Sequence, residues 1–134
     1  MSHEITYIEG PDISAQAFAE LFRSAGLRRP VDELPRLEAM LRNANLVIGA
    51  FSGGRLVGIA RAVTDFSYCC YLSDLAVAQS HQRQGIGSEL VRRVRARIGE
   101  GTMLLLLSTP DAMTFYPTIG FEPVTNAWMI RRRH

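Results

Sequence analysis

The residues most suggestive of chemistry in this chain are Gln82-Arg-Gln-Gly85-Ile-Gly87, which stand between an apolar run and a run with helical spacing. A strand, a short glycine-bearing loop and the first turn of a helix bring together backbone N–H groups that have no partner inside the helix. The positive end of the helix dipole adds to their attraction for a phosphate. A side chain at Gly85 or Gly87 would block the close approach of a bulky pyrophosphate. The sequence therefore predicts an anion-binding loop in this segment.

Two well-known phosphate loops do not fit the segment. A dinucleotide-binding fingerprint needs a third small residue where Leu90 stands and a tight turn directly after the strand, whereas residues 78–84 intervene here. A nucleoside-triphosphate P-loop needs Gly-Lys-Ser/Thr, and the chain contains no lysine. A different kind of phosphate site is therefore predicted.

Three segments in order along the chain resemble the GNAT superfamily of N-acetyltransferases. They are Leu75-Ala-Val77, Gln82-x-x-Gly85-x-Gly87 and Phe115-Tyr-x-x-x-Gly-Phe121, and the resemblance covers roughly residues 46–126. A lone Gly-x-Gly is weak evidence, but a distant aromatic motif in the right order makes the combination specific. The resemblance implies an enzyme that transfers an acetyl group directly from acetyl-CoA to an amine, without an acyl-enzyme.

The hydrophobic pattern predicts an α/β (α+β) chain that forms a single domain over residues 1–134. The expected strands are 4–9, 46–51, 56–63, 68–77, 103–107, 121–124 and 128–132. The first expected helix follows Asp12 or Ser14 as its cap, the second follows Asp32, and two more occupy 88–98 and 111–116. The strand at 103–107 lacks alternation, which predicts cover on both of its faces. The resemblance implies a strongly twisted, mixed central sheet of about seven strands flanked by about four helices, in which strands 71–77 and 103–107 splay apart.

The same resemblance implies where acetyl-CoA binds. The pantetheine arm would pair with backbone groups at the free edge of the strand before the glycine loop, and the pyrophosphate would meet N–H groups of the loop and the helix start. The residues carried over are Leu75, Ala76, Val77, Gln82, Arg83, Gln84, Gly85, Ile86, Gly87 and Ser88.

Two side chains are candidates for the catalytic chemistry. Tyr116 matches the tyrosine that commonly acts as general acid in the GNAT superfamily, and a phenol can donate a proton because it ionises only near pH 10. The alternative is aromatic packing beside Phe115 and Phe121. Asp74 is a charged residue in an otherwise apolar strand on the expected acceptor side, where partial burial could raise its pKa to that of a useful base. The alternative for Asp74 is a structural bond to a neighbouring loop or arginine.

Composition excludes several classes of protein. Hydrophobic residues make up 47% and charged residues 21% of the chain, which is ordinary for a globular domain. Cys69 and Cys70 are adjacent in an expected strand, point to opposite faces and are expected to be reduced. With only three scattered histidines besides, no metal site is predicted. No apolar run is long enough to cross a bilayer and the first residues lack a signal-peptide pattern, so a cytoplasmic protein without a membrane partner is predicted.

The arginines do not by themselves indicate nucleic-acid binding. All fifteen basic residues are arginines, the net charge is only +2, and clusters at 92–97 and 131–133 are typical of a solvated helix face and a polar chain end.

The predicted function is N-acetylation of a primary amine of a small molecule or metabolite. Acetylation of a protein N-terminus or lysine and a non-catalytic acyl-CoA sensor remain alternatives, and a homodimer is left open. The sequence does not identify the acceptor.

Overall fold

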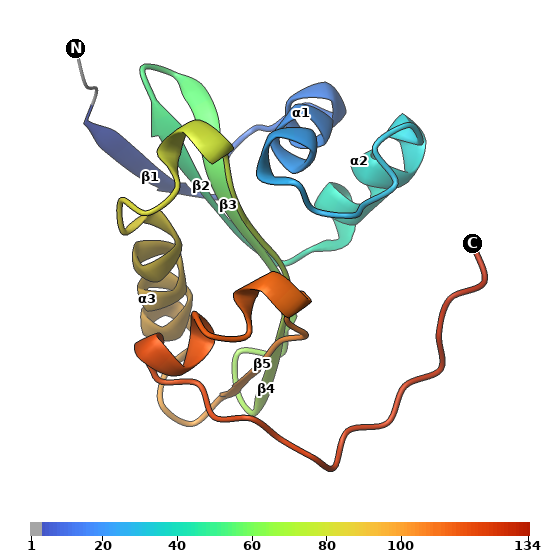
Figure 1. Ribbon diagram of the computed structural model, residues 1–134, viewed down its shortest axis with the longest axis vertical. Helices are drawn as coiled ribbons and strands as arrows, with labels where there is room; N and C mark the ends of the chain where they lie inside the picture. Colours follow the sequence, from blue (N-terminus) through green and yellow to red (C-terminus); the bar gives the residue numbers. More distant parts are fainter. Residues whose placement is uncertain (1–3) are drawn as a thin grey trace.

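The computed structural model describes residues 4–134, which form one five-stranded mixed sheet with three α-helices (Figure 1). The sheet order is β1-β2-β3-β4-β5; β4 and β5 are parallel and all other neighbours are antiparallel. In chain order the elements are β1 (Ile5–Glu9), α1 (Ala15–Ala25), α2 (Leu34–Asn43), β2 (Leu46–Ser52), β3 (Arg55–Thr64), β4 (Cys69–Val77), α3 (Ile86–Ile98) and β5 (Met103–Leu105). Three short 3₁₀ turns lie at Gln79–His81, Pro110–Ala112 and Tyr116–Ile119.

Local chemistry explains where several elements begin and end. Ser14 caps α1, because its Oγ accepts a hydrogen bond of 3.0 Å from the N–H of Ala17. Gly26 ends the same helix with a left-handed φ of 74°. Gly53 and Gly54 both have positive φ and close the hairpin between β2 and β3. These features match the elements predicted from the sequence.

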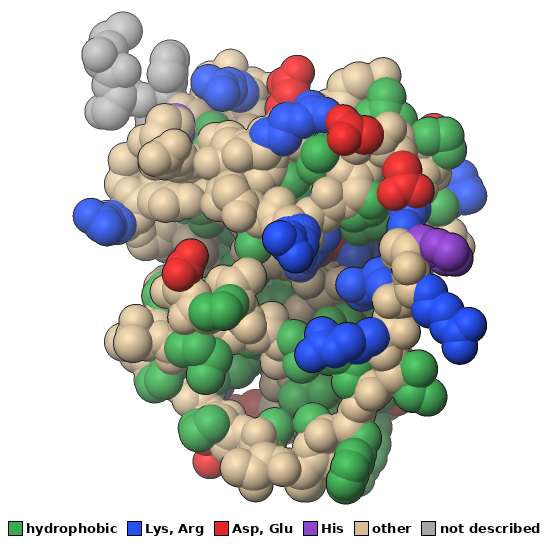
Figure 2. Space-filling view, turned by 45° about the vertical axis from the view of Figure 1, so that its right-hand side comes forward, with side chains coloured by type: hydrophobic (Ala, Val, Ile, Leu, Met, Phe, Trp, Pro, Cys, Tyr) green, Lys and Arg blue, Asp and Glu red, His purple; other side chains and the backbone are tan. Residues whose placement is uncertain are grey.

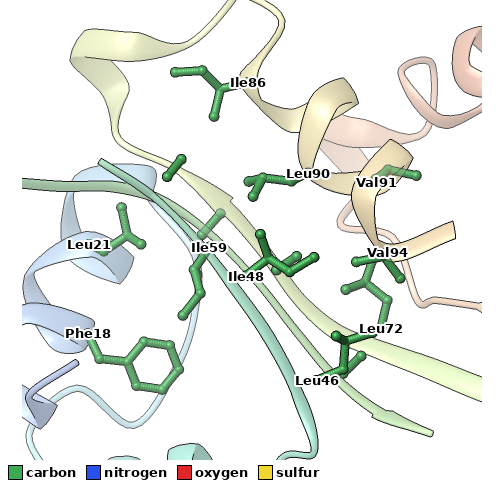
Figure 3. Packing of buried hydrophobic residues seen from close by; sticks show 14 of the residues in the cluster. Phe18, Leu21, Leu46, Ile48, Ile59, Leu72, Ile86, Leu90, Val91 and Val94 are labelled. Atoms are coloured by element: carbon green, nitrogen blue, oxygen red, sulfur yellow. The ribbon is translucent and has the colours of Figure 1, made fainter. Parts of the chain in front are cut away.

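The core consists of apolar side chains on both faces of the sheet. Phe18 and Leu21 of α1 pack on one face and Leu90 and Val94 of α3 on the other (Figure 3). The close approach of α3 depends on Gly58 in β3, where a Cβ would lie only 3.0 Å from Cγ2 of the first residue of α3. The core thereby fixes the start of α3 over the sheet.

The expected numbers of strands and helices are wrong. Residues 121–124 and 128–132 do not form strands, and the C-terminal segment instead runs extended past β5 (Figure 1). Trp128 is 98% and Ile130 100% exposed. Apolar character at these positions suggested strands, but a strand needs a partner, and this segment has none among the described residues.

The expected helix at 111–116 is also wrong. The expectation that both faces of a strand at 103–107 are buried is wrong as well. Pro110 and Pro117 lack an N–H, and the segment forms two 3₁₀ turns instead of one α-helix. The strand β5 ends at Leu105, and Met103 and Leu107 are more than half exposed, so the described residues do not cover both faces of this segment.

The turn between β3 and β4 generates a first prediction. The Asp65 carboxylate accepts hydrogen bonds of 2.9, 2.8 and 3.0 Å from the N–H groups of Ser67, Tyr68 and Cys69. These bonds lower the pKa of Asp65 from 3.8 to about 2. A lowered pKa means that the carboxylate stabilises the fold above its unfolded pKa and loses this effect as the pH falls through about 2.

We therefore expect Asp65→Ala to lower the free energy of unfolding at pH 7, and the difference from wild type to shrink as the pH falls from about 4 to about 2. Urea titrations across this range measure both quantities. Glu122→Ala removes a carboxylate from the exposed C-terminal segment and serves as control. A difference that is independent of pH would show that the ionised form of Asp65 does not stabilise the turn.

Candidate functional site

The connection from β4 to α3 is a tight loop held to the end of β4. The side chain of Gln82 donates a hydrogen bond of 2.9 Å from Nε2 to the carbonyl of Val77. Arg83 and Gly85 have φ of 64° and 84°, both in the left-handed region. A left-handed backbone is rare for a residue other than glycine, and such conformations persist where the surroundings enforce them, often at binding sites.

The first turn of α3 presents backbone donors without a cap. Gly85 is the N-cap residue and makes no side-chain capping bond. The N–H groups of Ile86, Gly87 and Ser88 therefore have no partner within the helix. Glu89 carries a negative charge in this turn. Arg92 and Arg93 donate hydrogen bonds to its carboxylate, which lower its pKa to about 2. The positive charges of these two arginines offset the charge of Glu89.

Gly87, in the first turn of α3, lies close to two other parts of the chain. A Cβ at this position would lie 3.6 Å from Cζ of Phe115 and 3.9 Å from Cγ2 of Val77. These are ordinary contact distances, so the fold itself does not require glycine here. The start of α3 is therefore next to the end of β4 and to the segment that carries Tyr116.

The strands β4 and β5 are paired over only part of their length. Among the described residues their parallel pairing covers Cys69–Tyr71 and Met103–Leu105 and goes no further. On its other edge β4 stays paired with β3 as far as Val77. Backbone groups of residues 72–77 that point away from β3 therefore lack a strand partner, and such groups can bind an extended ligand. Leu75 and Val77 lie in this stretch.

Tyr116 is a half-buried phenol with an accessible hydroxyl. Its ring packs edge-on against Phe115 and Phe121, with centroids 5.2 and 5.4 Å away. Within residues 4–134 the hydroxyl makes no hydrogen bond, and no buried side-chain polar atom lacks a partner, so the hydroxyl reaches solvent. Burial raises the pKa of Tyr116 above 10, opposed by the charge of Arg29. The phenol therefore keeps its proton at neutral pH.

Asp74 lies in a buried ion cluster. Its Oδ1 accepts a hydrogen bond of 2.6 Å from Nε of Arg29, and its Oδ2 accepts one from Nε of Arg61. The Asp74 side chain has no exposed surface, whereas those of Arg61 and Arg29 are 9% and 26% exposed. The structure thus places the predicted base between two guanidinium groups, which corresponds to the structural alternative.

A β-bulge adjoins this cluster. Arg61 pairs with Asp74 and Ala62 with Leu72, so Ser73 is the extra residue of β4. Arg29 donates 3.0 Å to the carbonyl of Ser73 and Arg61 donates 3.0 Å to its hydroxyl. Bulges are frequent next to active sites, where they redirect the chain.

Sequence reasoning missed Arg29 and Arg61. Arg61 is a single charged residue inside the apolar run of β3, and an isolated charge in a buried strand needs a partner. The isolated Asp74 in the next strand could have been matched to it on that ground. Arg29 lies in the loop between α1 and α2, where no sequence pattern indicates its contact with β4.

The start of α3 lies next to two other groups of predicted site residues. Gly87 is close to Val77 at the end of β4 and to Phe115, whose ring packs against that of Tyr116. Asp74 lies three residues before Val77 and binds Arg29. Within residues 4–134, no group of three or more His, Cys, Asp or Glu side chains is arranged to hold a metal ion. No helix in the same range is long and apolar enough to span a membrane.

Comparison with known proteins identifies relatives. Residues 11–129 match the acetyltransferase (GNAT) domain family. The histone acetyltransferase TAP1 of Glycine max is 26% identical over 133 residues, which cover 89% of this chain and 56% of the relative. The chain spans about half to two thirds of the length of the curated relatives it matches.

Solved structures show the same fold. A probable acetyltransferase from Staphylococcus aureus superposes with a TM-score of 0.81 at 21% identity, over 96% of this chain and 100% of the other. The aminoglycoside N-acetyltransferase AAC(6')-Iy, determined in complex with CoA, has a TM-score of 0.70 at 18% identity, over 100% of this chain and 97% of the other.

The ion cluster generates a prediction about stability. Asp74→Asn keeps the volume of the side chain but leaves two arginines without their counter-charge, one of them almost fully buried. We expect the free energy of unfolding to fall by about 3 kcal/mol or more. Glu38→Gln, which removes a carboxylate 4.0 Å from Arg42 on the surface, should cost less than about 1 kcal/mol. Equal losses in urea titrations of the two variants would show that the cluster contributes little.

Proposed function

The chain belongs to the GNAT acetyltransferase family, and we propose that it transfers an acetyl group from acetyl-CoA to a primary amine. The observation that carries this proposal is the uncapped start of α3 beside the unpaired edge of β4. Uncapped N–H groups at a helix start bind a phosphate, and an unpaired strand edge pairs with an extended chain that carries amides. CoA has both parts, so it would need these two features side by side.

The residues around the gap fit CoA in their chemistry. The N–H groups of Ile86, Gly87 and Ser88 would hold the pyrophosphate, with Gln82 to Gly85 shaping the loop around it. Backbone groups at 75–77 would pair with the amides of the pantetheine arm. Acetyl-CoA supplies the acetyl group in activated form, as a thioester.

Tyr116 supplies the proton that the leaving group needs. In the transfer, a C–N bond forms between the neutral amine and the acetyl carbon while the C–S bond breaks. The phenol of Tyr116 donates its proton to the departing sulfur, and the proton that the amine loses passes to solvent, from which Tyr116 is reprotonated. Because burial raises the pKa of Tyr116, the proton donor is in its protonated form at neutral pH.

Asp74 is proposed to position other groups rather than to remove the proton of the amine. Its carboxylate has no exposed surface and both of its oxygens face guanidinium groups. A general base has to come within hydrogen-bond reach of the amine, directly or through one water. The contact with Arg29 holds the loop between α1 and α2 on β4.

The names of the relatives point to different acceptors. One relative is named a histone acetyltransferase and one structural neighbour an aminoglycoside acetyltransferase, so similarity alone does not select a small molecule or a protein for this chain. A non-catalytic sensor would bind CoA but release no thiol with any amine. The cytoplasmic location and a homodimer stay predictions.

The first test of the proposal is binding. CoA at a hundredfold excess over its Kd should stabilise the folded protein by about 2.7 kcal/mol, which thermal unfolding detects. Gly87→Glu should abolish this effect, because it places bulk and negative charge at the start of α3. Gly101→Glu is a matched control, since Gly101 is exposed, has no positive φ and would contact only Ser67 O at 3.9 Å. Stabilisation of the Gly87 variant equal to that of wild type would place the phosphates elsewhere.

The second test concerns the chemical step. Tyr116→Phe keeps the ring packing and removes a hydroxyl that has no hydrogen bond in the described structure, so stability and CoA affinity should barely change. The single-turnover rate of acetyl transfer should fall by about 10²-fold. Tyr68→Phe removes a hydroxyl from a side chain that is 80% exposed and should be neutral. An unchanged rate for Tyr116→Phe would make Tyr116 a packing residue.

A further inference from the structure

Arg29 is held in one orientation by contacts with three parts of the chain. Its Nε donates to Asp74, its two terminal nitrogens donate to the carbonyls of Arg28 at 2.8 Å and Ser73 at 3.0 Å, and its guanidinium carbon lies 5.6 Å from the ring centre of Phe22. A guanidinium fixed in this way loses little conformational entropy when it binds a ligand.

The cluster around Arg29 carries an excess positive charge. Arg29 and Arg61 contribute two positive charges and Asp74 one negative charge, which leaves a net charge of +1. Figure 2 shows further basic side chains gathered around a hollow on the side of the molecule where α2 and the C-terminal segment lie. At the end of that segment, the carbonyl of His134 accepts a hydrogen bond of 3.2 Å from Arg36 of α2. An anionic ligand would be attracted to this face, and a polycation would be repelled.

Arg29 has hydrogen-bonding capacity to spare. A guanidinium has five N–H donors, and the described contacts use three of them, one on each nitrogen. One N–H remains on each terminal nitrogen, and 26% of the side chain is exposed. Two donors on one guanidinium suit a carboxylate, which accepts charge-assisted hydrogen bonds on both oxygens.

Arg29 lies at the edge of β4 next to the residues proposed to hold the cofactor. Its Nε binds Asp74 and its NH2 group binds the carbonyl of Ser73, the bulged residue, and these two residues directly precede Leu75. The charge of Arg29 also opposes the effect of burial on the pKa of Tyr116. An amine that reaches a thioester held along residues 75–77 would therefore bring the atoms next to its nitrogen close to Arg29.

We infer that Arg29 determines acceptor specificity by binding a carboxylate that the acceptor carries close to its amino group, as a free α-amino acid does. This inference rests on the proposed acetyl transfer and names the class of acceptor. A carboxylate there offsets the excess charge of the cluster. Amines without an acidic group, and polyamines above all, lack this contact.

The test compares acceptors that differ only in the carboxylate. The probes are glycine and the standard L-amino acids other than proline and cysteine, together with the corresponding amides, each assayed with acetyl-CoA by release of free thiol. We expect the best amino acids to exceed their amides at least tenfold in kcat/KM. The amines of the amides are less basic and more often neutral at pH 8, so amine basicity works against the expected result.

Variants assign the preference to Arg29. Arg29→Gln should lower kcat/KM for the amino acids, mainly through KM, by about 10-fold to 100-fold more than it lowers kcat/KM for the amides, which removes the preference. Arg29→Lys keeps the positive charge and should retain part of the preference for amino acids over amides. Arg42→Gln, which removes a positive charge from the exposed face of α2, should leave the ratio at the wild-type value. A purely structural role of Arg29 would lower the rates for both sets of probes by the same factor.

The outcomes separate this inference from the proposed function. If CoA stabilises the protein and amides or polyamines release thiol while amino acids do not exceed them, the inference is overturned and acetyl transfer stands. The inference about Arg29 is also overturned if other amines are acetylated and no amino acid is. If CoA does not bind, both fail. Should Arg29→Gln not fold, the acid-to-amide ratio of wild type and of Arg29→Lys still decides.

Discussion

The burial of one carboxylate governs how this protein is assembled around its site. Asp74 has no exposed surface, and an unpaired charge in such a place would cost several kcal/mol. Arg61 from the neighbouring strand and Arg29 from the loop between α1 and α2 satisfy it. The loop is thereby held against β4 at the bulge around Ser73. The same contact fixes the position of the Arg29 guanidinium on β4.

The other half of the site depends on packing rather than on charge. Leu90 and Val94 bury α3 against the sheet, and Gly58 lets the first residue of the helix come close to β3. The loop that enters the helix has Arg83 and Gly85 in the left-handed region. As a result the uncapped N–H groups of the helix lie beside the end of β4, where the pairing with β5 has already stopped. The groups proposed to bind CoA are backbone atoms, so their placement depends on the fold.

Sequence reasoning succeeds here where the signal is local. The hairpin of β2 and β3, the cap at Ser14 and the glycine loop are each specified within a few residues, and the resemblance to the GNAT superfamily is confirmed by the match over residues 11–129. The closing strands and the seven-stranded sheet are wrong, because apolar residues in a short segment do not reveal whether a neighbouring strand exists to receive it. The partners of Asp74 were missed for a related reason. Arg29 lies 45 residues away in the sequence, and only the fold brings the two together.

The two halves of the proposed site would respond differently to substitution. Backbone groups at 75–77 and 86–88 persist under most side-chain changes that keep the fold, so the proposed cofactor half can stay constant while the acceptor half changes. The proposed acceptor half depends on a side chain from the loop between α1 and α2, and loops tolerate change more readily than strands do. Arg29 is an exception within that loop, because it also neutralises a buried carboxylate. A substitution that alters the acceptor through Arg29 therefore also lowers stability, unless a compensating change accompanies it at Asp74.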